Sequence, residues 1–204
     1  SSFEHIKQLT TLFSKTAIEV CEGQQYDKDF ENLTIVSEKD YLEMIRLKTS
    51  VLIAASLQMG AIAGGADIDL QNKFYSFGIK TGLAFQIQDD FLDTYGNEKK
   101  FGKKTGGDIA VNKKTYLYVI AHKDANEIQR KKLEQLYSEQ STNIQLKLDT
   151  VLKIFNELNI ETKTKLKLNQ YFAEALEILD TMSINNSAKE FLKDFTSKLI
   201  NREY

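Results

Sequence analysis

A group of polar residues near the middle of the chain has the types and spacing that suit metal-assisted chemistry. Four residues separated by three or four positions would form one polar stripe on a helix: Gln86, Asp89, Asp90 and Asp93. Three aspartates at a helix C-terminus repel one another and oppose the helix dipole, at a cost of about 2–3 kcal/mol in total. A divalent cation removes this cost, and oxygen ligands without His or Cys favour Mg²⁺. A metal site is therefore favoured over a solvated acidic face.

The segment that follows the aspartates is rich in lysine and glycine. Between residues 96 and 114, six lysines stand against Glu98 and Asp108, so the local charge balance is +4. Glycines leave backbone N–H groups able to face a ligand, and carboxylates commonly hold Mg²⁺ together with phosphate oxygens. The two segments together indicate a phosphate-bearing substrate. No P-loop is present, because no Gly-x-x-x-x-Gly-Lys-Ser/Thr run follows a strand.

The elements that must position these residues are predicted to be helical throughout. The chain has 204 residues, no proline and ten glycines, and all ten glycines lie between Gly23 and Gly107. Residues 108–204 therefore lack both of the main turn formers, which excludes a strand-and-turn architecture. The composition, 42% hydrophobic and 27% charged, is that of a soluble globular protein. We expect a single helical domain over residues 1–204, and the net charge of −2 argues against a nucleic-acid partner.

Apolar periodicity and end signals place the individual helices. Ser37 with Asp40 forms a capping box, and Ser187 with Glu190 forms another. Gly78 and Gly82 lie one turn apart, which predicts a close approach of another helix. The stretch 163–168 alternates like an edge strand but continues a helical pattern, so we expect a helix there. The predicted helices cover residues 3–23, 38–65, 69–96, 112–122, 125–140, 143–158, 161–182 and 187–202, with loops at 24–36 and 96–111.

Two further features bear on the compartment of the protein. Residues 49–66 carry no charge, but they include serine, glutamine and several glycines, so we expect a helix packed against protein and no transmembrane segment. Cys21 is the only cysteine, which forbids an internal disulfide and suits the cytoplasm. We expect Cys21 to be a small buried residue at a helix end and not a nucleophile.

Four sequence elements, in order across about 90 residues, closely resemble the trans-isoprenyl diphosphate synthases, also called polyprenyl synthetases. The run from Gly82 to Asp93 contains that family's second aspartate-rich motif, and the run from Gly102 to Asp108 follows it as in the family. The run from Cys21 to Asp27 is similar to its Gly-Gln-x-x-Asp element. The helix from Tyr41 to Lys48 and Thr49 is similar to its Lys-Thr helix.

The resemblance implies an all-α, antiparallel helical bundle of the isoprenoid synthase type and a Mg²⁺-dependent prenyltransferase. Such an enzyme condenses isopentenyl diphosphate with an allylic diphosphate, and the family suggests a cytoplasmic homodimer. The predicted helices over 49–66 and 74–88 would form the walls of a pocket for the prenyl tail.

The resemblance also assigns roles to individual residues. Asp89, Asp90 and Asp93 would bind Mg²⁺ and so stabilise the departing diphosphate. The other implied site residues would contact the substrate or the developing carbocation. Lys48 and Lys103 would hold the diphosphate, and Thr49 and Gln86 would place oxygen dipoles near the developing cation. Gln24 would line the pocket, and Asp108 and Lys113 match the family's closing segment, where they would bind substrate.

One element of the family pattern is not found in this sequence. The first aspartate-rich motif and the arginine pair after it lie upstream of the Gly-Gln element in the family, and only 23 residues precede Gln24 here. We expect the chain to be the C-terminal part of a longer synthase, and this piece alone to be inactive. Two alternatives stay open: a non-catalytic partner subunit of a heteromeric synthase, and a class I terpene cyclase.

Overall fold

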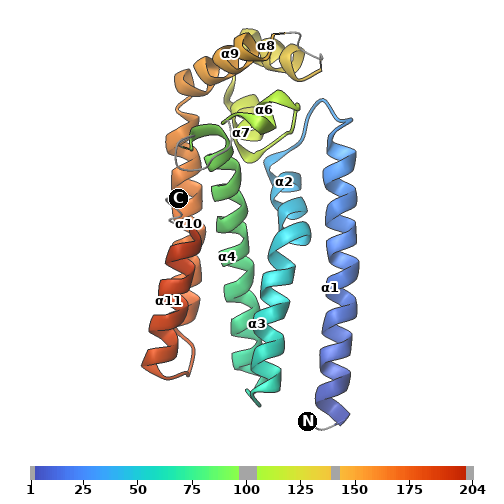
Figure 1. Ribbon diagram of the computed structural model, residues 1–204, viewed down its shortest axis with the longest axis vertical. Helices are drawn as coiled ribbons and strands as arrows, with labels where there is room; N and C mark the ends of the chain where they lie inside the picture. Colours follow the sequence, from blue (N-terminus) through green and yellow to red (C-terminus); the bar gives the residue numbers. More distant parts are fainter. Residues whose placement is uncertain (1–2, 97–104, 139–142, 201–204) are drawn as a thin grey trace.

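The computed structural model describes residues 3–96, 105–138 and 143–200, and every regular element within these ranges is a helix (Figure 1). The predicted all-α class is confirmed. The elements in chain order are α1 (Phe3–Phe30), α2 (Glu38–Ile45), the π-helical turn η1 (Arg46–Ser50), α3 (Val51–Ala63), α4 (Ile68–Tyr95), α6 (Gly107–Ala110), α7 (Tyr116–Asp124), α8 (Glu127–Ser138), α9 (Ile144–Glu157), α10 (Ile160–Asp180) and α11 (Asn186–Ile200).

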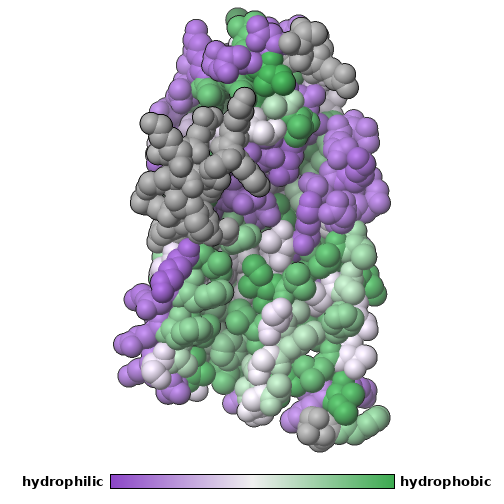
Figure 2. All heavy atoms as spheres, viewed as in Figure 1, coloured by the Kyte–Doolittle hydropathy of each residue, from purple (hydrophilic) through white to green (hydrophobic). Residues whose placement is uncertain are grey.

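The long helices stand side by side along the longest axis of the molecule and alternate in direction (Figure 1). The chain runs up α1, down the continuous α2–η1–α3 stretch, up α4, and later down α10 and up α11. The short helices α6 to α9 gather at the end of the bundle where α4 ends. Figure 2 shows apolar residues over much of the lower part of this face and hydrophilic residues toward that upper end. The polar end is therefore where the candidate site must be sought.

Helix α1 is longer than the sequence pattern predicts. The helix was expected to end near Gly23, but it continues to Phe30, so residues 24–30 are helical and not part of a loop. Gly23 lies inside α1, and a Cβ at this position would stand 2.3 Å from the Lys48 backbone nitrogen, so a larger residue would not fit. The glycine permits a close approach of two helices and does not end one. The expectation that Cys21 is buried is also wrong, since its side chain is exposed.

The second long helix begins as the sequence predicts. Ser37 is the N-cap of α2, and its Oγ accepts a hydrogen bond from the Asp40 backbone N–H at 3.1 Å. The helical path continues to Ala63, and Gly65 follows with a φ of +76°, a conformation that glycine adopts without strain. The π-helical turn at 46–50 has no signal in the apolar periodicity. Such turns are often found at functional sites.

Helices α3 and α4 pack with almost no space between their backbones. A Cβ at Gly78 would lie 2.4 Å from the Ala54 Cα, and one at Gly82 would lie 2.5 Å from the Ser50 Cα. The predicted close approach at these two glycines is confirmed. The stretch Glu38–Ala63 is long and apolar enough to cross a membrane by length and mean hydropathy, a test that core helices of soluble proteins also pass. Here it packs between α1 and α4.

The later helices agree with the predicted order, with local differences. Helix α7 starts at Tyr116 and not at residue 112, because residues 112–115 form an irregular connection. The stretch 163–168 lies within α10, and its alternating pattern does not produce a strand, because Thr164 and Leu168, one turn apart, are both buried. The last helix is capped by Asn185 and not by Ser187, since the Asn185 Oδ1 accepts the Ala188 N–H at 2.7 Å.

Candidate functional site

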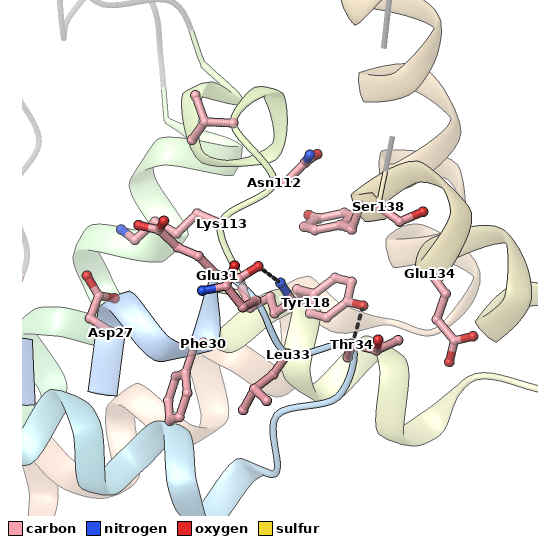
Figure 3. A pocket seen from close by; sticks show the side chains of 14 residues that line it. Asp27, Phe30, Glu31, Leu33, Thr34, Asn112, Lys113, Tyr118, Glu134 and Ser138 are labelled. Atoms are coloured by element: carbon pink, nitrogen blue, oxygen red, sulfur yellow. Dashed lines mark hydrogen bonds between the residues drawn. The ribbon is translucent and has the colours of Figure 1, made fainter. Parts of the chain in front are cut away.

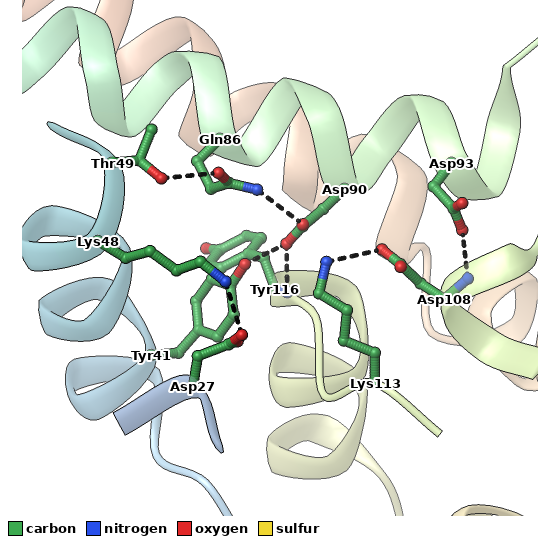
Figure 4. Close-up of polar contacts among 10 residues, drawn as sticks. All are labelled: Asp27, Tyr41, Lys48, Thr49, Gln86, Asp90, Asp93, Asp108, Lys113 and Tyr116. Carbon is green, nitrogen blue, oxygen red and sulfur yellow. Dashed lines mark hydrogen bonds and ion pairs between the residues drawn. The ribbon is translucent and has the colours of Figure 1, made fainter. Parts of the chain in front are cut away.

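The π-helical turn η1 places two of the predicted site residues beside other helices. The Lys48 ammonium group lies 2.7 Å from the Asp27 carboxylate of α1, and both side chains are partly exposed. The next residue, Thr49, donates a hydrogen bond from Oγ1 to the Gln86 Oε1 of α4 at 3.0 Å. Figure 4 shows these residues converging from three different helices. The turn therefore links the Gly-Gln-x-x-Asp element to the second aspartate-rich motif.

Asp90 is the buried hydrogen-bond centre of the site. Its side chain is 1% exposed, and its Oδ2 accepts hydrogen bonds from the Tyr41 hydroxyl and from the Tyr116 backbone N–H, the latter at 2.9 Å. Its Oδ1 accepts a longer hydrogen bond of 3.4 Å from the Gln86 Nε2. Burial raises the pKa of Asp90 to about 6, although the nearby Lys113 and these hydrogen bonds lower it. Asp90 thus joins α2, α4 and α7 (Figure 4).

Asp93 connects the end of α4 to the segment that carries Asp108 and Lys113. The Asp93 Oδ2 accepts the Asp108 backbone N–H at 2.9 Å, and the Asp93 carbonyl accepts the Gly106 N–H at 2.6 Å. The Lys113 ammonium lies 3.2 Å from the Asp108 carboxylate. Burial opposes the charge of Lys113, but the carboxylates of Asp90 and Asp108 outweigh it and raise the pKa of Lys113. Burial also raises the pKa of Asp93.

The three aspartates expected to bind Mg²⁺ have different environments. Asp89 is exposed, Asp93 is partly buried, and Asp90 is enclosed by protein donors. Within the described ranges, no three Asp, Glu, His or Cys side chains are grouped closely enough to hold a metal ion, so the expected three-aspartate cluster is not assembled there. The Asp90 oxygens accept hydrogen bonds from protein donors, and its role as a metal ligand stays a prediction. Mg²⁺ is often held by only one or two carboxylates plus substrate phosphate and water, which Asp89 and Asp93 fit.

A cavity of about 700 Å³ adjoins the polar residues. Asp27 and Lys113 line it, together with the end of α1, the 111–114 segment and part of α8, as Figure 3 shows. Two smaller cavities of about 310 and 300 Å³ lie lower in the bundle, and both are lined by Leu12, Lys15 and Gln58. These three cavities therefore lie along α1, from its lower half to the polar end. A further cavity of about 540 Å³ lies away from α1, between α2, α4 and α10.

Among the described residues, two predicted site residues make none of these hydrogen bonds or ion pairs: Gln24 and the exposed Asp89. Gln24 lies on α1 one residue after the buried Gly23, and its side chain is exposed. Lys103 lies outside the described residues. Among the described residues, the predicted group that does come together is Lys48, Thr49, Gln86, Asp90, Asp93, Asp108 and Lys113.

The structure adds three residues that sequence reasoning did not select. Asp27 pairs with Lys48, and it was visible as the last residue of the Gly-Gln-x-x-Asp element. Tyr41 and Tyr116 hold Asp90, and their positions, 49 and 26 residues away in sequence, have no local signal. Only the approach of α2 and α7 to α4 shows that these two tyrosines serve the site.

Comparison with known proteins agrees with this architecture. Residues 1–155 match the family model described as polyprenyl synthetase. A geranylfarnesyl diphosphate synthase from Natronomonas pharaonis is 32% identical over 204 residues, which covers 100% of this chain and 56% of the relative. A short chain isoprenyl diphosphate synthase from Methanothermobacter thermautotrophicus is 31% identical, covering 98% of this chain and 61% of the relative.

Comparison with a solved structure also shows similarity to a prenyl diphosphate synthase. A crystal structure of a geranylgeranyl pyrophosphate synthase matches with a TM-score of 0.92 and 40% identity, covering 100% of this chain and 63% of that structure. The fold is thus the all-α isoprenoid synthase fold. The chain belongs to the polyprenyl synthetase family. It spans between 56% and 63% of the length of these three proteins.

Proposed function

We propose that the chain forms part of the active site of a trans-prenyl diphosphate synthase, which joins isopentenyl diphosphate to an allylic diphosphate. The observation that carries this proposal is the set of lysines and carboxylates at the polar end of α4. Electrostatic interactions connect Lys113 with Asp27, Asp90 and Asp108, and Lys48 lies beside Asp27. We call this group, Asp27, Lys48, Asp90, Asp108 and Lys113, the rim. Cations and carboxylates grouped in this way suit a diphosphate and its counter-ion.

The lysines of the rim are held by carboxylates in the ligand-free protein. Lys48 pairs with Asp27 at 2.7 Å, and Lys113 pairs with Asp108 at 3.2 Å. A diphosphate would compete for the same ammonium groups, so both lysines are already oriented toward an anion. Lys103 would add a third cation. Asp89 and Asp93 would hold Mg²⁺, which neutralises charge on the leaving diphosphate.

Thr49 and Gln86 provide dipoles beside this rim. Thr49 donates its hydroxyl proton to Gln86, so the lone pairs of the Thr49 oxygen stay available to face a positive charge. In the reaction, the allylic C–O bond breaks and diphosphate leaves. The terminal carbon of isopentenyl diphosphate then forms a C–C bond to the allylic carbon, and a proton is lost to restore a double bond. Two correctly placed oxygen dipoles stabilise the positive charge on carbon during this step.

The prenyl tail would extend from the rim along the lower part of the bundle. The two cavities next to Leu12 and Gln58 lie between α1, the uncharged helix α3 and the first half of α4. The predicted wall over residues 49–66 consists of the end of η1, all of α3 and the turn after it, and the predicted wall over residues 74–88 lies within α4. An apolar, water-excluding channel would also protect the carbocation.

The proposal includes a homodimer in the cytoplasm. Large apolar side chains of α1 are exposed, among them Phe3, Phe13 and Ile18, which supports contact with another protein surface. The single cysteine, Cys21, is free, and this suits a reducing compartment.

Product analysis tests the proposed function. The complete synthase, and not this piece alone, is incubated with labelled isopentenyl diphosphate, Mg²⁺ and allylic diphosphates of increasing length, and the products are separated by chain length. We expect chain-extended product from the complete synthase, and its loss with Asp89→Ala or with a chelator. Lys39→Ala, a change at an exposed residue away from the rim, is the matched control. Consumption of the allylic diphosphate alone would identify a cyclase, and no turnover by folded protein would favour a partner subunit.

A further inference from the structure

The segment that carries Asp108 and Lys113 contains two residues in the left-handed region of backbone conformation. Gly106 has a φ of +82° and Asn112 has a φ of +63°. Asparagine tolerates this region better than most residues, but it adopts it at a cost that the surroundings must offset. These two positions flank α6, so they set the direction of the backbone on either side of Asp108. Their conformations therefore decide where Asp108 and Lys113 point.

Consecutive residues of α9 contact both left-handed positions. The Lys147 ammonium donates a hydrogen bond to the Asn112 Oδ1. The next residue, Leu148, fills the space beside Gly106, since a Cβ on that glycine would lie 2.5 Å from the Leu148 Cδ2. On its other side the segment is tied to α4 by the bonds from Gly106 and Asp108 to Asp93. The segment is thus held between α4 and α9.

Lys147 is an unusual residue for such a contact. Its side chain is 1% exposed, and among the described residues no carboxylate lies within ion-pair distance of it. Its ammonium stands 5.2 Å from the centre of the Tyr137 ring, and Tyr137 is itself 5% exposed. Lysine is almost never fully buried without a charged partner, because desolvation disfavours the cation. The contact with Asn112 is therefore the main polar interaction that this buried cation makes.

We propose that Lys147 is a positioning residue for the candidate site, which fixes the backbone at Asn112 and so holds Lys113 and Asp108 in place for diphosphate binding. Nothing in the sequence pattern of the aspartate-rich motif points to it, because Lys147 lies 35 residues beyond Asn112. The hydrogen bond and the Tyr137 ring together orient its ammonium. The consequence for binding rests on the proposed function, whereas the consequence for the 105–115 backbone does not.

Thermal unfolding and two further measurements on four proteins test the proposal. The proteins are the wild type, Lys147→Met, Lys147→Arg and the control Lys153→Met, which changes an exposed lysine of the same helix. Hydrogen exchange of residues 106–116 reports the backbone, and calorimetric titration with inorganic pyrophosphate and Mg²⁺ reports the site. We expect Lys147→Met to unfold at the same or a higher temperature, to exchange faster in 106–116, and to bind pyrophosphate about tenfold more weakly. Lys147→Arg keeps a cationic donor and should restore most of the affinity, whereas Lys153→Met should match the wild type.

Several outcomes separate this inference from the proposed function. If Lys147→Met folds and both exchange and affinity equal those of the wild type, the positioning role is overturned while the proposed function stands. If the wild type binds no pyrophosphate but exchange in 106–116 still rises in Lys147→Met alone, the hold on the backbone is supported and the proposed function fails. Should Lys147→Met not fold, Asn112→Asp tests the same contact, because an ion pair to Lys147 should slow exchange. Unchanged or faster exchange in Asn112→Asp would overturn the proposal.

Discussion

The helix pair α3 and α4 and the polar rim at the upper end of α4 are held together by different kinds of contact. Along the pair, backbones meet through glycine, with Gly78 against Ala54 and Gly82 against Ser50. At the rim, helices are joined by polar side chains that reach across, as Asp90 is joined to α2 and α7. The pair depends on the absence of side-chain atoms, whereas the rim depends on hydrogen bonds whose partners are distant in sequence.

This difference shows how the two regions should respond to change. In the helix pair an added atom meets backbone, which cannot move aside cheaply. At the rim, an added or removed charge meets other charges and buried polar groups, so its effect depends on pH and on bound ligand. Substitutions in the two regions test that contrast.

The largest effect is expected from adding one methyl group between α3 and α4. In Gly78→Ala the new Cβ would lie 2.4 Å from the Ala54 Cα, so the two backbones must separate. We expect the free energy of unfolding to fall by about 3 kcal/mol or more. Gly60→Ala is the matched control, because nothing lies within 4 Å of its Cβ, and it should stabilise α3 by about 1 kcal/mol. Urea unfolding followed by circular dichroism measures both, and equal effects would contradict the close-packing interpretation.

At the rim, Asp90→Asn should stabilise the ligand-free protein in a pH-dependent manner. The folded pKa of about 6 lies above the usual 3.8, so the native state binds this proton more readily than the unfolded state. The stability that Asp90 contributes is therefore present below pH 4 and is lost as the pH rises through 6. We expect Asp90→Asn to raise the free energy of unfolding by about 3 kcal/mol at pH 8, and by far less at pH 4.

Unfolding in guanidinium chloride at pH 4 and pH 8 measures this difference. Asp89→Asn is the control, since Asp89 is exposed on the same helix and its replacement should change stability little at either pH. A gain from Asp90→Asn that is equal at both pH values would show that burial of the charge is not its cause.

A smaller effect is expected at the start of α2, which carries Tyr41 to Asp90. Ser37→Ala removes the side-chain oxygen that accepts the Asp40 N–H, and we expect a loss of about 1 kcal/mol in the free energy of unfolding. Lys39→Ala, at an exposed neighbour without a capping role, should stay within about 0.5 kcal/mol of the wild type. Thermal unfolding of the two variants compares them. A loss as large from Lys39→Ala would contradict the capping role of Ser37.

The sequence predicted the helix pair better than the rim. Gly78 and Gly82 are spaced by one helical turn, so the close approach of another helix could be predicted from the local sequence. Gly23 was misinterpreted as a helix end, because a close approach to Lys48 and a helix terminus both favour glycine. Asp90 was expected to bind metal together with Asp89 and Asp93, and this stays a prediction. Its burial by Tyr41 and Tyr116 is a non-local property.

The amino-acid sequence by itself determined the all-helical class, most helix boundaries and the family, because periodicity, capping residues and short motifs are local properties of the chain. The tertiary structure alone decided which carboxylates stay accessible and which lysines face them. It also brought Lys147 to Asn112 across 35 residues. Burial and charge pairing depend on which helices meet, and that is settled only when the whole bundle packs.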